Sequence, residues 1–169
     1  LTIVLQASSA TMAITMLLAA SGLIDFKLAV AMVLGENIGT TITANIAAAV
    51  ANTSAKRAAR AHTIFNIVGV IWVLAVFRPI VKLICVIMVN LGFQDPMAAS
   101  AQLASIANSG IAADPAEIEM YKNSLLYGIA MLHTLFNVTN TLVLIWFVPL
   151  IEKAVLWLVN EPKGEAKVF

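Results

Sequence analysis

Gly35-Glu36-Asn37-Ile38-Gly39-Thr40-Thr41 is a polar, glycine-bracketed stretch within the apolar run 28–50. A second polar motif, Gln6-Ala7-Ser8-Ser9-Ala10, opens the apolar run before it. In hydrocarbon every unpaired backbone group costs several kcal/mol, so glycines and hydroxyl residues at that depth are tolerated only where they are buried in protein or line a water-filled cavity. The two motifs therefore predict a membrane protein with a site for an ion or a solute.

The composition also indicates a membrane protein. Hydrophobic residues make up 61% of the chain and charged residues 11%, with a mean hydropathy of +0.94. In soluble domains, apolar residues make up about 45–50% and charged residues about 25%. The net charge of +1 gives no reason to expect a nucleic-acid partner. Because no nucleotide-binding loop, catalytic triad or metal-hydrolase spacing is present, we expect that the protein is not an enzyme.

We predict an all-α polytopic membrane domain over residues 1–149, followed by a helix and charged tail over 150–169 on the cytoplasmic side. The helix over 11–24 covers about 21 Å, which is short of the roughly 30 Å of hydrocarbon, so residues 1–24 are predicted to be a re-entrant limb. The glycines around Glu36 predict that the span 28–50 is broken by an unwound centre. The remaining predicted segments are spans over 61–77 and 124–148, an interfacial or bent helix over 80–91, and a polar loop over 92–121.

Basic residues predict the orientation of the chain. Lys56, Arg57 and Arg60 form a basic cluster that is expected in a loop, and the tail carries Lys153, Lys163 and Lys167. The positive-inside rule places this cluster and the C-terminus in the cytoplasm. This orientation places three basic residues on the opposite, non-cytoplasmic side of the membrane, namely Arg78, Lys82 and Lys122. Since the first residues already belong to an apolar element, we expect the chain to be a portion of a longer protein.

The first motif has the chemistry of an anion site. Gln6, Ser8, Ser9 and Thr11 supply one amide and three hydroxyl groups at a predicted helix N-terminus. Free N–H groups and the positive end of the helix dipole suit phosphate, sulfate or carboxylate there. The alternative is that these small polar residues only cap a helix or allow close packing.

The second motif has the chemistry of an alkali-cation site. An unwound centre would free backbone carbonyls, and hard oxygen ligands of this kind suit Na⁺ better than a transition metal. Glu36 is a candidate cation ligand or proton-sensitive switch; the alternative is an interfacial carboxylate that reaches water. Broken helices of this kind are typical of secondary transporters. The candidate sodium ligands are Glu36, Asn37, Thr40, Thr41 and Thr43, and no other metal is expected.

A short repeat links two predicted spans. His62-Thr63-Ile64-Phe65-Asn66-Ile67 recurs as His133-Thr134-Leu135-Phe136-Asn137-Val138. The histidine and asparagine of each copy are four positions apart and share a helix face. We predict that His62, Asn66, His133 and Asn137 make polar contacts between helices, because two histidines without a carboxylate or cysteine partner make a poor metal site.

Taken together with Lys56-Arg57-Ala58-Ala59-Arg60-Ala61-His62 and Phe65-Asn66, the two motifs resemble the second inverted repeat of the type II sodium-dependent phosphate cotransporter family, whose bacterial members are Na/Pi cotransporters. That family carries a glutamine followed by three serines and a Gly-x-Asn-Ile-Gly-Thr-Thr segment in each of two repeats. The resemblance covers residues 1 to about 75 and the last span. Ala7 replaces a serine of the family pattern, and Glu36 stands where relatives often have a small residue.

The resemblance implies half of an inverted-repeat secondary transporter. Gln6, Ser8 and Ser9 would then help to hold phosphate, and Glu36, Asn37, Thr40 and Thr43 would occupy positions that contribute to sodium sites. The implied function is sodium-coupled symport of inorganic phosphate by alternating access in a multi-pass protein of the cell (inner) membrane. Its partners are inorganic phosphate, Na⁺ as the coupling ion, the lipid bilayer, an N-terminal repeat of the same protein and a C-terminal soluble regulatory domain, with no cofactor.

Two other functions fit the same motifs. A passive anion or cation channel would share the polar breaks but would not accumulate solute against a gradient. A transport-dead membrane regulator of phosphate signalling would bind partners and tolerate loss of the hydroxyl groups.

Overall fold

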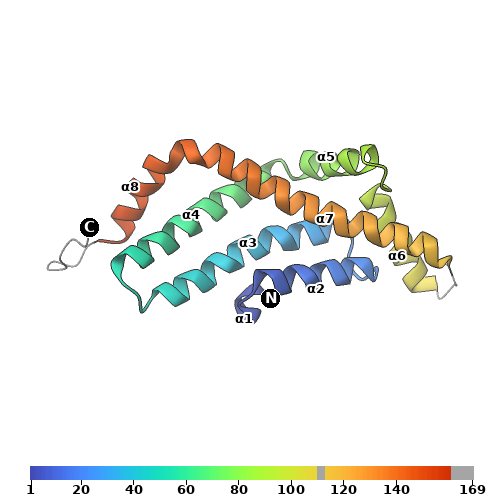
Figure 1. Ribbon diagram of the computed structural model, residues 1–169, viewed down its shortest axis with the longest axis horizontal. Helices are drawn as coiled ribbons and strands as arrows, with labels where there is room; N and C mark the ends of the chain where they lie inside the picture. The colour runs from blue at the N-terminus through green and yellow to red at the C-terminus, as the bar shows by residue number, and fades with distance from the viewer. Residues whose placement is uncertain (110–112, 161–169) are drawn as a thin grey trace.

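The computed structural model describes residues 1–109 and 113–160, and every regular element in these ranges is helical (Figure 1). The predicted all-α class is therefore confirmed. Residues 161–169, with Lys163 and Lys167 of the predicted tail, lie outside the described residues. The helices are α1 (Thr2–Leu5), α2 (Ser8–Ala20), α3 (Phe26–Ala48), α4 (Thr53–Ala75), α5 (Phe77–Asn90), α6 (Pro96–Ser109), α7 (Pro115–Leu144) and α8 (Val148–Leu158), with the 3-10 turn Ile145–Phe147 before α8.

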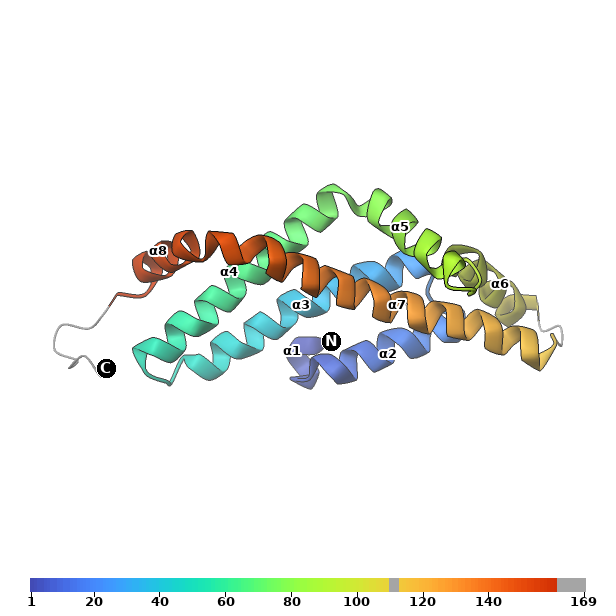
Figure 2. The same ribbon diagram turned by 45° about the horizontal axis from the view of Figure 1, so that its top comes forward.

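The helices pack around α7. Helices α3 and α4 lie side by side as an antiparallel pair, and α7 runs across them and α2 toward α6 (Figures 1 and 2). The main core lies where α7 meets α2, α3, α5 and α6, and a smaller cluster joins α3, α4 and α7. The largest fully buried side chains of the main core include Phe26, Ile84, Met88, Leu125, Ile129 and Leu132.

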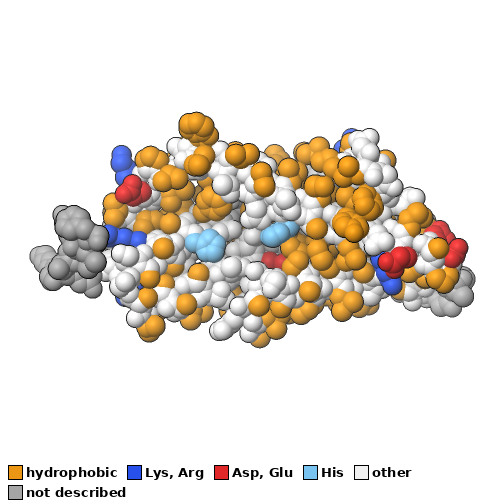
Figure 3. All heavy atoms as spheres, in the orientation of Figure 1, with side chains coloured by type: hydrophobic (Ala, Val, Ile, Leu, Met, Phe, Trp, Pro, Cys, Tyr) orange, Lys and Arg blue, Asp and Glu red, His pale blue; other side chains and the backbone are white. Residues whose placement is uncertain are grey.

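Two helical stretches of the described residues are long and apolar enough to cross a membrane, Thr53–Ala75 and Pro115–Leu158. They overlap the predicted spans 61–77 and 124–148. Large apolar side chains are also exposed, with Trp146 82% and Trp157 78% accessible, and hydrophobic side chains occupy much of the face in Figure 3. Water is a poor solvent for such a surface, so lipid or further protein is expected to cover it.

The predicted unwound centre of the span 28–50 is wrong, because α3 runs without a break from Phe26 to Ala48. Its polar side chains donate back to carbonyls of their own helix, so the helix accommodates them without unwinding. Gly39 serves packing instead: a Cβ atom there would lie 2.7 Å from Cβ of Thr2 on α1. Gly35 has no atom within 4 Å of a Cβ position. Neither glycine frees a run of backbone carbonyls.

The predicted polar loop 92–121 is also wrong, since α6 and the first turns of α7 occupy most of it. Its two Asp-Pro pairs are helix starts. Asp95 accepts from the N–H of Met97 at 2.8 Å and Asp114 from that of Ala116 at 2.9 Å, and a proline follows each aspartate. Proline is favoured in a first helical turn because its missing N–H would be unpaired there in any case.

The basic cluster lies in a helix and not in the predicted loop. Asn52 accepts from the N–H of Ala55 at 2.9 Å and caps α4, which begins at Thr53. Lys56, Arg57 and Arg60 therefore occupy the first two turns of α4. The connection between α3 and α4 is shortened to residues 49–52, which holds the two helices as a tight pair.

Candidate functional site

A cavity of about 530 Å³ lies among α2, α3, α4 and α7 and gathers most of the predicted site residues. In Figure 3, histidine side chains border a hollow near the middle of the visible face. Segments that are far apart in the sequence meet here, which is what a binding site between packed helices requires. We call this cavity the central pocket; its polar lining is Ser8, Ser9, Glu36, Asn37, Thr40, His62, Asn66, His133 and Asn137.

The start of α2 supplies hydrogen-bond donors to the central pocket. Gln6 adopts a left-handed conformation with φ of 52° and ends α1, and Ala7 is the extended residue before α2. Because alanine has no side-chain acceptor, the first N–H groups of α2 carry no side-chain cap. The hydroxyl groups of Ser8 and Ser9 make no hydrogen bond with any residue that the structure describes. Backbone and hydroxyl donors thus remain available at one helix N-terminus, an arrangement that suits an anion.

The middle of α3 supplies acceptors instead. The amide nitrogen of Asn37 donates to the carbonyl of Val33 at 3.0 Å, and the hydroxyl of Thr40 donates to the carbonyl of Glu36 at 2.9 Å. Thr40 has thereby used its one donor and Asn37 one of its two amide N–H groups, so each offers the pocket the lone pairs of its side-chain oxygen, and Asn37 keeps one further N–H. Together with the carboxylate of Glu36, such oxygen lone pairs suit a hard cation.

Glu36 is the carboxylate of the pocket and is only 6% exposed. The hydroxyl of Thr15 on α2 donates to its Oε1 at 2.7 Å. This partner was missed by the sequence reasoning, although Thr15 lies four residues after Thr11 and therefore on the same face of α2. The hydrogen bond fixes the carboxylate between α2 and α3, so the two motif helices meet through it.

The repeated His-Asn pairs line the pocket rather than joining helices. Asn66 donates to the carbonyl of His62 at 3.0 Å, and Asn137 donates to that of His133 at 2.8 Å, each within its own helix. The prediction of helix–helix contacts by these four residues is therefore wrong. Both imidazoles border the cavity, one from α4 and one from α7.

Two other asparagines join the helices. Asn45 donates to the hydroxyl of Thr63 at 2.6 Å, which links α3 to α4. Fully buried Asn140 donates to the carbonyl of Phe65 at 3.2 Å and accepts from Trp72 at 3.3 Å, which links α7 to α4. The sequence did not predict these two contacts, because the repeated His-Asn motif pointed to Asn66 and Asn137 instead.

Four of the predicted binding residues lie outside the central pocket. Gln6 is exposed at the turn between α1 and α2. Thr11 donates to the carbonyl of Ala7 at 3.0 Å and lines a smaller cavity of about 250 Å³, which Glu36 also borders. Thr41 and Thr43 donate at 2.8 Å to carbonyls of their own helix, those of Ile38 and Thr40.

The electrostatics of the central pocket are set by few groups. Within the described residues, no lysine or arginine lines it, so its formal charges are limited to Glu36 and whatever proton the histidines carry. An anion in this pocket would be bound by uncharged donors and would need a bound cation to balance its charge.

A model of the Na⁺/Pi-cotransporter family matches residues 1–94 of the chain. The chain belongs to the Na⁺/Pi-cotransporter family. The match covers α1 to α5, and with them every residue of the central pocket except His133 and Asn137. This is a family of transporters and not of enzymes, and together with the two long apolar helices it identifies a membrane protein.

One curated relative is an uncharacterized protein, YqeW of Bacillus subtilis (strain 168). It is 43% identical over 74 residues, which make up 44% of this chain and 24% of the relative. The chain thus spans about a quarter of the length of this relative. No solved structure matches the chain.

Proposed function

We propose that the chain supplies one half of the substrate site of a symporter that moves inorganic phosphate together with Na⁺ by alternating access. The observation that carries this proposal is the division of the central pocket into a donor side and an acceptor side. The donors of Ser8, Ser9 and the α2 N-terminus face the phosphate, and the oxygens of Glu36, Asn37 and Thr40 face Na⁺. Family membership supports the same pair of solutes.

The charge of phosphate explains why transport is coupled to Na⁺. Moving a doubly charged anion out of water is costly unless it is paired, and the pocket has no lysine or arginine among its described lining residues. A cation about 4 Å from the anion contributes about 4 kcal/mol at the effective dielectric constant near a protein surface. Bound Na⁺ therefore favours phosphate entry, and phosphate in turn favours Na⁺ binding.

The proposed ligand sets are narrower than those predicted from the sequence. Ser8 and Ser9 form the phosphate set, because Gln6 and Thr11 do not line the pocket. Glu36, Asn37 and Thr40 form the sodium set, because Thr41 and Thr43 do not line the pocket.

In the membrane, we place the start of α4 and the end of α8 on the cytoplasmic side of a multi-pass protein of the cell (inner) membrane. The guanidinium of Arg57 donates to the carbonyl of Val159 at 3.2 Å, so these two ends lie together, as the positive-inside rule requires of Lys56, Arg57, Arg60 and Lys153. An N-terminal repeat of the same protein supplies the other half of the site. Residues 1–24, which include α1 and α2, form a re-entrant segment that enters and leaves the membrane from the same side. A C-terminal soluble regulatory domain is a further proposed partner.

Uptake of phosphate by the full-length protein in proteoliposomes tests this proposal. We expect saturable accumulation driven by an inward Na⁺ gradient and little uptake when K⁺ replaces Na⁺. Equal, non-saturable uptake in both salts would indicate a channel and contradict the coupling. Absence of uptake by well-folded protein would favour the transport-dead regulator.

A further inference from the structure

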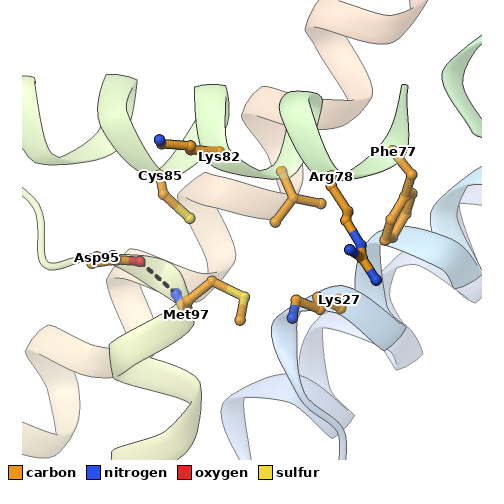
Figure 4. Close-up of a pocket in the computed structure, with 8 residues that line it drawn as sticks. Lys27, Phe77, Arg78, Lys82, Cys85, Asp95 and Met97 are labelled. Carbon is orange, nitrogen blue, oxygen red and sulfur yellow. Dashed lines mark hydrogen bonds between the residues drawn. The ribbon is translucent and has the colours of Figure 1, made fainter. Parts of the chain in front are cut away.

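A second cavity, of about 500 Å³, lies at the opposite end of α4 from Lys56 and Arg60. It is an open cavity bordered by the first turn of α3, by α5 and by the start of α6 (Figure 4). The cavity shares no lining residue with the central pocket, so an inference about it does not depend on the proposed function. We call it the basic cavity; its lining is Lys27, Arg78, Lys82 and Asp95, with Phe77, Val81, Cys85 and Met97 as the less polar part.

Three cationic side chains border this cavity against one carboxylate. In Figure 4, Arg78 extends from α5 toward Lys27 on α3, whereas Lys82 lies farther along α5 and its ammonium group points away from both. Among the described residues, none of the three forms an ion pair. Asp95 already accepts the N–H of Met97 at 2.8 Å as the cap of α6. All three cations are exposed to water, and the cavity carries an excess of positive charge that a bound anion would offset.

The uncapped start of α5 increases the positive potential of the cavity. Lys27 is the second residue of α3, which Asp25 caps by accepting from the N–H of Leu28 at 2.7 Å, whereas Arg78 is the second residue of α5, whose start has neither a side-chain cap nor an acidic residue. The N-terminal end of a helix carries partial positive charge, which disfavours cations and favours anions there. Arg78 thus stands where a stabilising helix would have an acid, whereas the start of α6 at the same cavity is capped by Asp95.

We propose that the basic cavity binds a phosphate group between Lys27 and Arg78, with Lys82 at the border of the site. The planar guanidinium of arginine matches two phosphate oxygens, and lysine ammonium groups bind phosphate as point charges. The same chemistry is presented by inorganic phosphate and by the headgroup of an anionic phospholipid. The site therefore differs from the central pocket, since it holds its ligand through charge and not through neutral donors.

The test uses full-length protein carrying K27Q/R78Q, with two companion variants. K56Q/R60Q is the matched control, because it removes one lysine and one arginine from the exposed start of α4. K27R/R78K keeps both charges and is the rescue variant. All four proteins, including the wild type, are checked for a single symmetrical peak in size-exclusion chromatography.

Two probes distinguish the sources of the phosphate group. Radiolabelled inorganic phosphate is measured by equilibrium dialysis of delipidated protein in an S8A/S9A background, and retained phosphatidylglycerol is counted by native mass spectrometry. We expect K27Q/R78Q to weaken binding of one probe about tenfold or more, with the control and rescue variants close to wild type. Loss confined to phosphate identifies a free-phosphate site, and loss confined to phosphatidylglycerol identifies a headgroup site. Unchanged binding of both probes by K27Q/R78Q, or binding of neither by the parent protein, would overturn the proposal.

Discussion

The N-terminal turn of α2 and the middle of α3 face the same pocket but present opposite hydrogen-bonding groups to it. The helical conformation is interrupted at Gln6, between α1 and α2, and Ala7 leaves the start of α2 without a side-chain cap. The hydroxyls of Ser8 and Ser9 donate to no residue that the structure describes. In α3 the helix is unbroken, the hydroxyl of Thr40 and one amide N–H of Asn37 donate to its carbonyls, and the side-chain oxygens remain as acceptors. The uncapped start of α2 therefore favours an anion, and the acceptor oxygens of the unbroken α3 favour a cation.

The largest effect is expected from removing the donor side. S8A/S9A deletes two hydroxyl groups that we propose to bond charged phosphate oxygens, each worth about 1.5–3 kcal/mol. Phosphate uptake at a fixed, subsaturating phosphate concentration should fall about 100-fold or more, with normal expression. S21A/S54A, which removes two exposed serine hydroxyls elsewhere, is the control. Wild-type uptake by S8A/S9A would remove these serines from the site.

A smaller but specific effect is expected on the acceptor side. E36Q removes the carboxylate of the central pocket while keeping its shape and an acceptor for Thr15. The Na⁺ concentration that gives half-maximal uptake should rise about tenfold or more, because a charge-assisted contact is lost. E119Q, an exposed carboxylate near the start of α7, should leave this concentration unchanged. An unaltered Na⁺ dependence in E36Q would show that Glu36 is not a sodium ligand.

The two glycines of the α3 motif offer a stability test of the unbroken helix. G39A places a Cβ atom 2.7 Å from Cβ of Thr2, and overpacking of this kind costs about 1–3 kcal/mol. G35A adds a Cβ atom with nothing within 4 Å, and alanine is favoured over glycine in a helix by up to about 1 kcal/mol. Thermal unfolding in detergent should show a lower Tm for G39A and an equal or higher Tm for G35A. If the motif were unwound, G35A would be destabilising too.

The smallest effect is expected from the link between the two motif helices. T15V keeps the shape of the side chain but removes the hydroxyl that donates to Glu36 at 2.7 Å. A net loss of about 1 kcal/mol corresponds to about a fivefold increase in the Na⁺ concentration that gives half-maximal uptake, with no change in maximal uptake. T134V changes an exposed threonine of α7 and serves as the control. A change in maximal uptake without a change in Na⁺ dependence would contradict a role in positioning Glu36.

Much of this organisation could be predicted from the sequence. Composition and the two motifs predicted the all-α class, and the serine run predicted a helix N-terminus, which the structure has at Ser8. The errors have a common cause, since residues that suggest breaks in isolation are used differently in context. Asp95-Pro96 and Asp114-Pro115 start helices because the aspartate caps the turn that the proline opens.

The side-chain contacts between helices could not be predicted from local sequence patterns. Thr15, Asn45 and Asn140 bond to residues 18 or more positions away, and their partners depend on how the helices pack. Gly69 illustrates the point, because a Cβ atom there would lie 2.5 Å from the Asn140 amide, a constraint that exists only once α4 and α7 are in place. The division of the pocket into donors and acceptors likewise depends on which side chains bond within their own helix.

Separate binding of each ion tests the division of the central pocket most directly. Isothermal titration of the full-length protein would measure Na⁺ binding in the absence of phosphate and phosphate binding at saturating Na⁺, in S8A/S9A and in N37A/T40A. We predict that S8A/S9A weakens phosphate binding and leaves Na⁺ binding unchanged, whereas N37A/T40A weakens Na⁺ binding on its own. If S8A/S9A weakened Na⁺ binding without phosphate as much as N37A/T40A does, the two sides would not be distinct and the account would be contradicted.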